Sequence, residues 1–531
     1  MTTTRRPEVA PAQHAPAVSR WLAALAGVLA AVAALAAAEV VAALLGGAGS
    51  PITAIGTAVI NLAPPALKDA AIDLLGTADK PALITGVVLA LTVLAAATGV
   101  LAVRRFWMGA AGVALLGTIG LAAALVDPAA TTDAGVGRVG ASLPAVAAVV
   151  VGIAVLRGLV TRLAQPSGAG GSAHDGDARR AFLRAAGVIG VSALAGGGVA
   201  RGLVARSSSQ AAPSTVQLVA ADRPLPPVPA DASLSVQGLS PFVTPNDSFY
   251  RIDTALRAPV VAIDDWQLSI AGMVDNPMEL TYEQLLEYEV VEADITLACV
   301  SNEVGGNLIG NARWRGVRIA DLLADAGVQP GADQLVGRAV DGFTAGSPLE
   351  TVLDGRDSLI AVGMNGQPLP RLHGFPARIV VPGLYGYVSA TKWLAELELT
   401  TFDAFDAYWV PRGWAAQAPI KTQSRIDVPR GAARVRPGTV TVAGVAWAQS
   451  RGIAQVEVQV DDGPWEQARL SEAVGADTWR QWVHEWEATE GSHQLRVRAT
   501  DETGQTQTEE RVPPRPDGAT GWHTVAVQVG A

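Results

Sequence analysis

The sequence predicts a multi-domain protein: an all-α transmembrane helical region, then an α+β domain, then an immunoglobulin-like β-sandwich. Composition is the first observation, because half of the 531 residues are hydrophobic and only 17% are charged, too few charges for a wholly soluble chain of this length. Position is the second, because the long uncharged runs all lie before residue 201. The third is a change of pattern after residue 230, where short strand-like and helical segments replace these runs.

Four apolar runs predict a four-helix transmembrane region over residues 1–163. Each is close to the ~20 residues that span a bilayer, and they cover residues 21–45, 81–103, 106–126 and 142–160. One such run could be a buried core helix, but four in succession favour membrane spans. The stretch 46–80 is interrupted by Pro64 and Pro65, so we expect it to lie at the interface or to re-enter rather than to span.

Residues 164–205 are expected to form a cytoplasmic loop followed by a fifth hydrophobic helix over 185–200. Arg179 and Arg180, followed by Phe182, Leu183 and Arg184, resemble the twin-arginine export motif. A basic stop at the cytoplasmic end of an ordinary helix is the alternative, and both interpretations give the same topology. Arginines cluster before the first run, between the second and third, and between the fourth and fifth. The positive-inside rule therefore predicts a multi-pass plasma-membrane protein whose C-terminal domains are extracytoplasmic.

A haem group in the membrane region would need axial ligands, which are usually histidines. None of the six histidines falls in a hydrophobic run; they are His14, His174, His373, His484, His493 and His523. We therefore expect no membrane haem and assign the region to anchoring or to docking of a partner. A linker rich in Pro, Ser and Ala is expected over 206–230.

The α+β domain is expected over residues 231–415. Strand-like segments at 266–271, 289–297 and 378–381 alternate with helical ones at 282–287 and 319–326. The only cysteine, Cys299, lies at the end of the second strand, and the residues after it should form a loop: Ser301, Asn302, Gly305, Gly306 and Gly310. A lone thiol in this place is either a small buried hydrophobe or a nucleophile or soft metal ligand.

Residues 416–531 show apolar and polar residues alternating with period two, separated by turns rich in Gly and Asp. This pattern is typical of an immunoglobulin-like β-sandwich.

Several motifs in the second half of the chain resemble the sulfite oxidase family of molybdopterin enzymes. They are TPNDSFYRID (244–253), TLACVSN (296–302), WRGVRIADLL (314–323), DGFTAGSPLE (341–350), and NGQPLPRLHGFPAR (365–378) followed by VVPG and by a lysine that precedes a tryptophan. The resemblance covers the chain from about residue 225 to the C-terminus. It implies a molybdenum–molybdopterin cofactor (Mo-co), Cys299 as the molybdenum ligand, and a homodimer formed through the β-rich C-terminal domain.

The same resemblance assigns residues to the cofactor and the substrate. Cofactor contacts fall on Phe249, Tyr250, Arg251, Asp341, His373, Arg378, Ala390, Thr391 and Lys392. Arginine and lysine suit the phosphate of a pterin cofactor. For Arg378 the alternative is a buried ion pair, and for His373 it is a loop histidine with no cofactor role. Besides Cys299, the candidates on the substrate side are Arg251, Arg313 and Tyr385 or Tyr387.

The implied function is a membrane-anchored, extracytoplasmic, sulfite oxidase-like oxidoreductase that transfers an oxygen atom to or from a small oxyanion. The family's sulfite-oxidising members typically carry arginines just after the cysteine, whereas this chain has Glu303 and no arginine before Arg313. A neutral S-oxide or N-oxide, used by a reductase, is therefore the alternative substrate. Because no haem domain is fused to these motifs, we expect a separate electron-transfer partner.

Other classes of protein receive less support. A cofactor-free, membrane-anchored binding module is the main alternative, and molybdenum content distinguishes it from an enzyme. The net charge of −10, without a basic cluster outside the membrane loops, gives no support to nucleic-acid binding. One cysteine excludes a disulfide within the chain, and nothing in the spacing of histidine and Asn or Asp around Cys299 supports a cysteine hydrolase.

Overall fold

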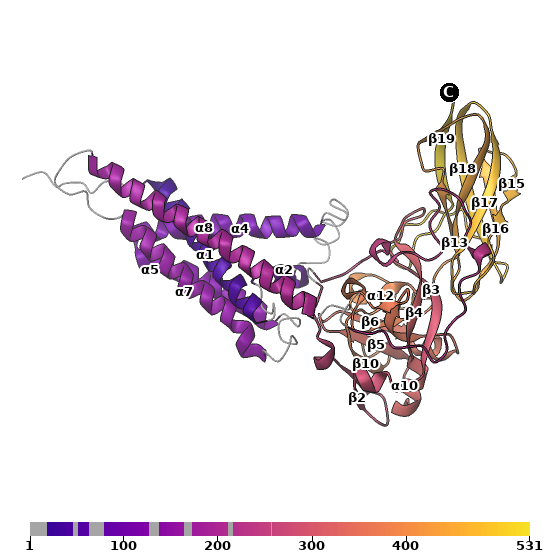
Figure 1. The fold of residues 1–531 in the computed structure, drawn as a ribbon, viewed down its shortest axis with the longest axis horizontal. Coiled ribbons are helices and arrows are strands. Elements are labelled where there is room, and N and C mark those ends of the chain that lie inside the picture. The colour runs from indigo at the N-terminus through magenta and orange to yellow at the C-terminus, as the bar shows by residue number, and fades with distance from the viewer. Residues whose placement is uncertain are drawn as a thin grey trace, which may run out of the picture. The chain divides into compact units, whose positions relative to one another are not determined.

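The computed structural model describes residues 19–45, 51–62, 79–126, 137–163, 173–210, 216–255 and 258–530. The chain forms two compact units, Met1–Ser208 and Ser209–Ala531 (Figure 1). Each unit is described by itself below.

The first unit consists of helices. They are α1 (Arg20–Leu44), α2 (Pro51–Leu62), α4 (Asp79–Arg104), α5 (Phe106–Val126), α7 (Gly137–Leu163) and α8 (Ala173–Gln210). Five of them contain segments long and apolar enough to cross a membrane, in agreement with the five predicted runs: Arg20–Leu44, Ala82–Arg104, Phe106–Val126, Ser142–Leu163 and Arg180–Ala200. Helix α2, with 12 residues, is too short to span, and Pro64 and Pro65 lie outside the described residues.

Helices α1 and α4 approach so closely that only glycine fits at their contact. A Cβ atom on Gly27 would lie 2.0 Å from the Ala95 carbonyl oxygen, and one on Gly99 would lie 2.1 Å from that of Ala23. Small residues at such crossings are the usual basis of helix packing in a membrane.

Helix α8 is longer than predicted. It includes Arg179 and Arg180, part of the expected cytoplasmic loop, and residues 206–210 of the expected linker. Alanine and arginine are strong helix formers, so the helical backbone continues on both sides of the apolar run.

The second unit begins with two sheets that form the α+β domain. One sheet has the order β2-β1-β10-β5-β6, and its strands are Met278–Thr281, Gln267–Gly272, Leu394–Thr400, Gln334–Ala339 and Thr344–Pro348. The other has the order β3-β4-β7-β8, and its strands are Val290–Ala298, Ile309–Arg318, Leu359–Met364 and Gln367–Pro368, with β9 (Arg378–Val380) also paired to β7. All strand pairs are antiparallel except β1 with β10.

Short helices connect these strands. They are α9 (Tyr282–Leu285), α10 (Ile319–Ala326), α11 (Leu349–Leu353) and α12 (Gly386–Ser389), with 3₁₀ turns at Ala230–Ala232, Asn246–Ser248, Ile263–Asp265, Arg371–His373 and Val410–Arg412. The predicted segments 289–297 and 319–326 correspond to β3 and α10. Cys299 follows the last residue of β3, as predicted.

Two expectations for this domain were wrong. Gly310 belongs to strand β4 and not to the loop after Cys299; it is needed there because a Cβ atom would lie 2.8 Å from the ring of Phe249. Residues 216–230 pack on the domain and are not a free linker. The Asp222 N–H donates to the Val290 carbonyl over 2.8 Å, and the Glu292 N–H donates to the Arg223 carbonyl over 3.3 Å. This segment thereby supplies partners to the outer edge of β3, which would otherwise be unpaired.

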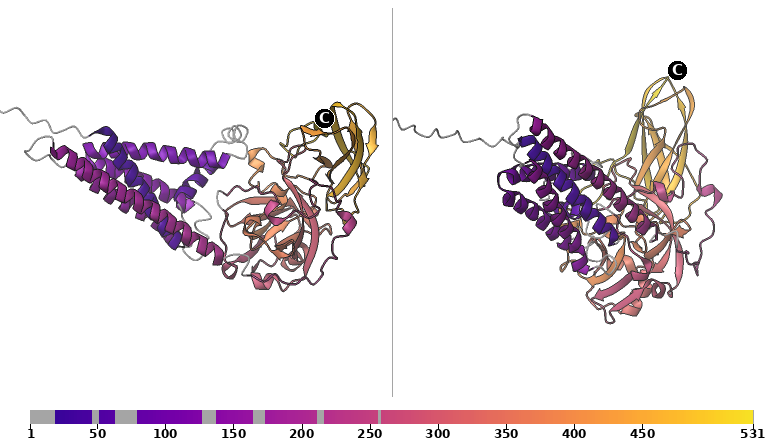
Figure 2. Two further views of the ribbon diagram at one scale, coloured as in Figure 1. Left: turned by 45° about the horizontal axis from the view of Figure 1, so that its top comes forward. Right: turned by 60° about the vertical axis from the view of Figure 1, so that its left-hand side comes forward.

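The C-terminal part of the second unit is an immunoglobulin-like sandwich of two sheets that face each other (Figure 2). One sheet has the order β11-β13-β17-β16, with strands Gln423–Val428, Gly438–Trp447, Arg480–Ala488 and Arg469–Leu470. The other has the order β12-β19-β18-β14-β15, with strands Ala433–Val435, His523–Val529, Gly491–Asp501, Ile453–Val460 and Trp465–Gln467. Val442, Trp482 and Leu495 are fully buried between the sheets, which confirms the period-two prediction.

Candidate active site

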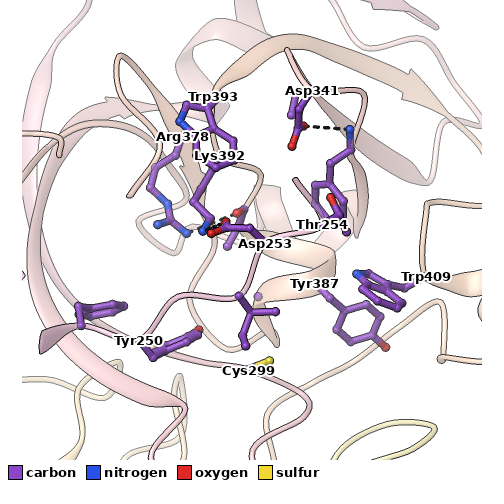
Figure 3. A pocket seen from close by; sticks show the side chains of 16 residues that line it. Tyr250, Asp253, Thr254, Cys299, Asp341, Arg378, Tyr387, Lys392, Trp393 and Trp409 are labelled. Carbon is purple, nitrogen blue, oxygen red and sulfur yellow. Dashed lines mark hydrogen bonds and ion pairs between the residues drawn. The ribbon is translucent and has the colours of Figure 1, made fainter. Parts of the chain in front are cut away.

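One pocket in the α+β domain brings together residues from six separate stretches of sequence (Figure 3). Its lining comes from most of residues 249–254, from Cys299, from the end of β5 and the turn after it, from Arg378 on β9, and from part of the segment between α12 and Trp393, and Trp409 completes its wall. It contains about 720 Å³ of empty space, including the part open to solvent. This is the size range of cofactor and small-molecule sites.

Cys299 faces this pocket with only 8% of its surface exposed. Its N–H donates to the Leu308 carbonyl over 2.9 Å, and its carbonyl accepts from the Asn302 N–H over 3.0 Å, so the loop fixes its backbone. Burial raises the pKa of the thiol, although hydrogen bonds from Ser301 and the charge of Lys392 act in the opposite direction. A thiol in such surroundings becomes a thiolate when a cation or a metal compensates its charge.

Arg378 places a buried guanidinium at the same pocket. Its Nη1 donates to the His373 carbonyl over 3.1 Å, its Nη2 donates to that of Ala390 over 3.4 Å, and its Cζ lies 5.1 Å from the centre of the Trp314 ring. Burial lowers the pKa of Arg378 to about 10. Within the described part of the chain no carboxylate forms an ion pair with this side chain, so the alternative of a buried ion pair does not apply.

Lys392 is the second cation, and its ammonium group pairs with the carboxylate of Asp253 across the pocket (Figure 3). Burial lowers the pKa of Lys392, and the charge of Asp253 opposes this shift. Gly374 allows the two cations to lie together. Its φ is +113°, and a Cβ atom there would lie 3.0 Å from the Lys392 Cβ and 3.1 Å from the Arg378 Cβ.

Aromatic rings support the cationic side of the pocket. Phe249 and Tyr250 both line it and stack at 5.3 Å between ring centres. Behind them, the edges of Trp314 and His373 meet Phe249 at 5.9 and 5.7 Å. The Nε2 of His373 donates to the Asn246 carbonyl over 2.8 Å, and burial lowers the pKa of His373 to about 4. At neutral pH this histidine is therefore an uncharged support rather than part of the pocket lining.

Several sequence-predicted residues lie outside the pocket lining. Arg313 donates from Nε and Nη2 to both carboxylate oxygens of Asp294, over 2.9 and 2.7 Å, so its charge is already compensated. Tyr385 is buried, with 4% of its surface exposed, and does not line the pocket. The pocket thus does not bring Arg313 and Tyr385 to its lining, and their roles toward the substrate stay predictions.

Of the remaining predicted residues, some line the pocket and others lie outside its lining. Asp341, Ala390 and Tyr387 line the pocket, and the Tyr387 hydroxyl donates to the Ala415 carbonyl over 2.6 Å. Thr391 is fully buried and donates to Gly337, whereas the side chain of Arg251 is exposed beside the pocket.

Sequence reasoning missed some residues of the lining. They are Ile252, Asp253, Thr254, Ala339, Phe343, Gly386, Trp393 and Trp409. Asp253 and Phe343 lie inside motifs that the sequence had singled out, and their neighbourhood was the available signal. Trp409 follows β10 at a distance from any motif and carried no such signal.

The chemistry of these side chains fits an anionic cofactor that carries a thiophilic metal. Among the described residues, no cluster of three or more His, Cys, Asp or Glu could hold a metal ion by protein ligands alone. A single thiol together with two buried cations instead suits one thiolate–metal bond and a phosphate-bearing organic group. The residues present therefore fit Mo-co.

Comparison with known proteins agrees with this assignment. Residues 255–409 match the family described as "Oxidoreductase molybdopterin binding domain", and residues 423–497 match the bacterial Ig domain. The chain is 29% identical over 343 residues to the mitochondrial sulfite oxidase of Mus musculus, covering 54% of this chain and 62% of that enzyme. It is 36% identical over 149 residues to the uncharacterized oxidoreductase YuiH of Bacillus subtilis, covering 28% of this chain and 72% of YuiH.

Among solved structures, the sulfane dehydrogenase SoxCD from Paracoccus pantotrophus superposes with a TM-score of 0.49 at 24% identity, covering 56% of this chain and 83% of that one. The chain spans about three fifths of the length of the mitochondrial sulfite oxidases that it matches. On its matching domain and relatives, the chain belongs to the sulfite oxidase family of molybdopterin-dependent oxidoreductases.

Proposed function

We propose that this protein is a membrane-anchored, extracytoplasmic enzyme that uses Mo-co to transfer an oxygen atom to or from a small substrate. The observation that carries the proposal is the convergence of the Cys299 thiol with the buried cations Arg378 and Lys392 on one pocket. When bound there, Mo-co would supply the redox chemistry of oxygen transfer.

The roles of the chain's own residues follow from their contacts. Cys299, as a thiolate, would ligate the molybdenum through a soft and strongly donating sulfur. Arg378 offers a planar set of donors, and Lys392 a point charge, to the anionic part of the cofactor. The aromatic rings of Tyr387, Trp393 and Trp409 wall the pocket and reduce the access of water to it.

The substrate proposed first is a small oxyanion such as sulfite, in line with the named relatives. One observation favours a neutral S-oxide or N-oxide as second candidate. Lys392 is paired with Asp253, and Arg378 is assigned to the cofactor, so the described lining offers no further cation to an oxyanion. Asp341 adds a second carboxyl group to the wall. Glu303, which first suggested this alternative, is exposed and does not line the pocket.

Membrane anchoring and topology are parts of the same proposal. Large apolar side chains point outward from the helical unit, for example Leu89 and Val93 on α4 and Leu194 on α8, as expected for surfaces in contact with lipid. The arginine distribution supports an extracytoplasmic position for the catalytic domain, by the positive-inside rule. The twin-arginine-like motif would suit export of a domain already folded around its cofactor. A separate electron-transfer partner and a homodimer complete the proposal.

The first test is metal analysis with pterin fluorescence on full-length wild-type protein and on the Cys299→Ser variant, both made in a host that synthesises Mo-co. We expect about one molybdenum per chain in the wild type, since one thiolate is available to bind it. Cys299→Ser should alter or lose the metal signal and abolish turnover. Absence of molybdenum from the wild type would instead favour the cofactor-free binding module.

The second test is steady-state turnover with sulfite as oxygen acceptor and with uncharged S-oxides and N-oxides as oxygen donors, using artificial electron carriers. Oxidation of sulfite supports the first substrate class. Reduction of the neutral oxides, without sulfite oxidation, supports the second.

A further inference from the structure

Strand β3, which leads to Cys299, is an edge strand of its sheet. All nine of its residues are buried, so the backbone groups on its outer edge need partners other than water. Near its beginning, Asp222 and Arg223 supply them. Near Cys299, the partners come from the immunoglobulin-like domain.

Thr296, three residues before Cys299, is the centre of this contact. Its N–H donates to the Asp477 carbonyl over 2.9 Å, and its carbonyl accepts from Nε2 of Gln449 over 2.9 Å. Its hydroxyl accepts from the Trp479 N–H over 2.8 Å and donates to Oδ1 of Asn311 over 2.9 Å. Thr296 is fully buried, and three of these four hydrogen bonds join it to the immunoglobulin-like domain.

The hydrogen bonds belong to a closed network between the two domains. The indole N–H of Trp479 and the amide of Asn311 both donate to the Phe242 carbonyl, over 2.9 and 3.0 Å. Trp479 and Trp447 are buried in the same cluster as Val300, the residue after Cys299. The immunoglobulin-like domain therefore shares a core with the strand that bears the cysteine.

The loop after Cys299 is held by the same domain. Nη1 of Arg425 donates to the Gly306 carbonyl over 2.7 Å, while Nε of Arg425 is bound to Asp427 over 2.6 Å. Gly305, with a φ of +80°, lies against His523, where a Cβ atom would be 2.2 Å from the ring. Contacts from the immunoglobulin-like domain thus flank Cys299 on both sides along the chain.

The side chain of Gln449 indicates that this contact requires a hydrogen-bond donor. Its side chain is fully buried, and its Oε1 has no hydrogen-bond partner in the described part of the chain. A buried amide oxygen without a partner is destabilising, and leucine would fill similar space without this cost. The glutamine provides what leucine cannot, a donor to the carbonyl of Thr296.

From these contacts we propose that the immunoglobulin-like domain positions the Cys299 thiol in the pocket, with Thr296 and Gln449 as its main positioning residues. The inference rests on the proposed function, in which Cys299 is the molybdenum ligand. It assigns to this domain a role within the chain that does not depend on dimerisation.

The first experiment measures access to the thiol in the full-length, cofactor-free protein. Cys299 is the only cysteine, so the labelling rate with a maleimide reports on this position alone. Thr296→Val keeps the shape but loses both hydroxyl hydrogen bonds, and Thr296→Ser keeps the hydroxyl. We expect labelling roughly three- to tenfold faster in Thr296→Val, because losing buried hydrogen bonds favours local opening, and a near wild-type rate in Thr296→Ser.

Gln449→Leu and Gln507→Leu form the matched control pair. Both glutamines are buried in the immunoglobulin-like domain, but among the described residues the side chain of Gln507 bonds only within that domain, to Ser424, Ala499 and Gly521. We expect Gln449→Leu to label faster than the wild type and Gln507→Leu to label at the wild-type rate, even if both melt at a lower temperature. Equal acceleration by both, or none in Thr296→Val and Gln449→Leu, would overturn the proposal.

The second experiment uses the Mo-co-loaded enzyme. The Mo(V) electron paramagnetic resonance signal should shift in Thr296→Val and Gln449→Leu at unchanged molybdenum content, and stay as in the wild type in Thr296→Ser and Gln507→Leu. An unchanged signal in the first two variants would contradict positioning. If the wild type itself contains no molybdenum, the proposed function fails, while the labelling rates still decide whether this domain positions Cys299.

Discussion

The helical unit and the C-terminal unit differ in the side chains that they bury and expose. In α1 the buried positions are nearly all Ala or Gly: Ala23, Ala26, Gly27, Ala30, Ala34, Ala38 and Ala42. Many large apolar residues face outward from this unit, although Leu156, Leu159 and Phe182 are fully buried in it. The C-terminal unit buries Trp314, Trp447 and Trp482, and among its described residues only Ile252, Leu353 and Leu372 are exposed large hydrophobics.

This difference indicates two ways of stabilising a fold. In the C-terminal unit, removal of large apolar surfaces from water drives packing. In the helical unit, small residues allow helices to approach closely, and many large apolar side chains stay on the outside, as in helices that pack within a membrane. The two interiors also differ in polarity. The described interior of the helical unit contains one buried polar side chain, Thr98, whereas that of the C-terminal unit includes Arg378 and His373.

The largest expected effect comes from removing the buried charge of the C-terminal unit. In Arg378→Met, the pocket loses a cation that the anionic cofactor would need, and removing one partner of a buried charge pair costs on the order of 3–5 kcal/mol. We expect Mo-co occupancy, measured as molybdenum per chain, to fall more than about a hundredfold. The cofactor-free protein should lose only about 1–3 kcal/mol, because the carbonyls of His373 and Ala390 lose their donor.

Arg378→Lys is the control for this variant. It keeps a charge but not the planar set of donors, so occupancy should fall to an intermediate level. Arg378 is a structural residue if Arg378→Met unfolds the cofactor-free protein or binds Mo-co as the wild type does. In either case the buried charge of the C-terminal unit has no role in cofactor binding.

The second prediction concerns acid stability. Burial lowers the pKa of His373 from 6.5 to about 4, so between these values the unfolded chain binds more protons than the folded one. The contribution of His373 is therefore complete above pH 6.5 and is lost as pH falls from 6.5 to 4. We expect a loss on the order of 2–3 kcal/mol for the cofactor-free protein, measured by denaturant unfolding at a series of pH values.

His373→Gln should flatten part of this acid limb. His493→Gln is a suitable control, because the pKa of His493 is raised by its hydrogen bond to Asp461 and its removal should not reduce the acid loss. An acid limb of unchanged slope in His373→Gln would show that this ring already reaches solvent in the folded protein.

Arg378, His373 and Cys299 illustrate what the sequence alone can predict. Arg378 and His373 were found from a motif, and Cys299 was placed at a strand end because a β-branched apolar run stops there. Local pattern was enough for such cases. It was not enough for Arg313, whose partner Asp294 lies directly opposite on the neighbouring strand, a register set only by folding.

Other differences have the same origin. Tyr385 precedes the four-residue helix α12 and Tyr387 lies within it, and so short a helix has no periodicity that would show which ring faces the pocket. Residues 216–230 have the composition of a linker, but they pair with an edge strand about 70 residues away. The contacts of Gln449 and Trp479 with Thr296 join positions more than 150 residues apart and have no local signal.

The third prediction tests the interior of the helical unit. Gly27→Ala places a methyl group 2.0 Å from the Ala95 carbonyl oxygen, so α1 and α4 must separate. We expect a destabilisation of about 1–3 kcal/mol, measured by unfolding in detergent. Gly86→Ala is the matched control on α4, because a Cβ atom there meets nothing within 4 Å. Its effect should be neutral or stabilising. Equal losses in both variants would contradict close packing as the basis of this unit.

The smallest expected effect is on the outward face of the same unit. Leu94 on α4 is 49% exposed, whereas Leu335 on β5 is 1% exposed. In membrane-reconstituted protein, Leu94→Ala should change stability by no more than about 0.5 kcal/mol, since the residue remains in an apolar surrounding and leaves no cavity. Leu335→Ala should cost about 2–5 kcal/mol in the C-terminal unit, because it removes a buried side chain and leaves a cavity. Similar losses in the two variants would mean that protein rather than lipid covers the Leu94 side of α4. The exposed large side chains on that face would then require a partner chain to cover them.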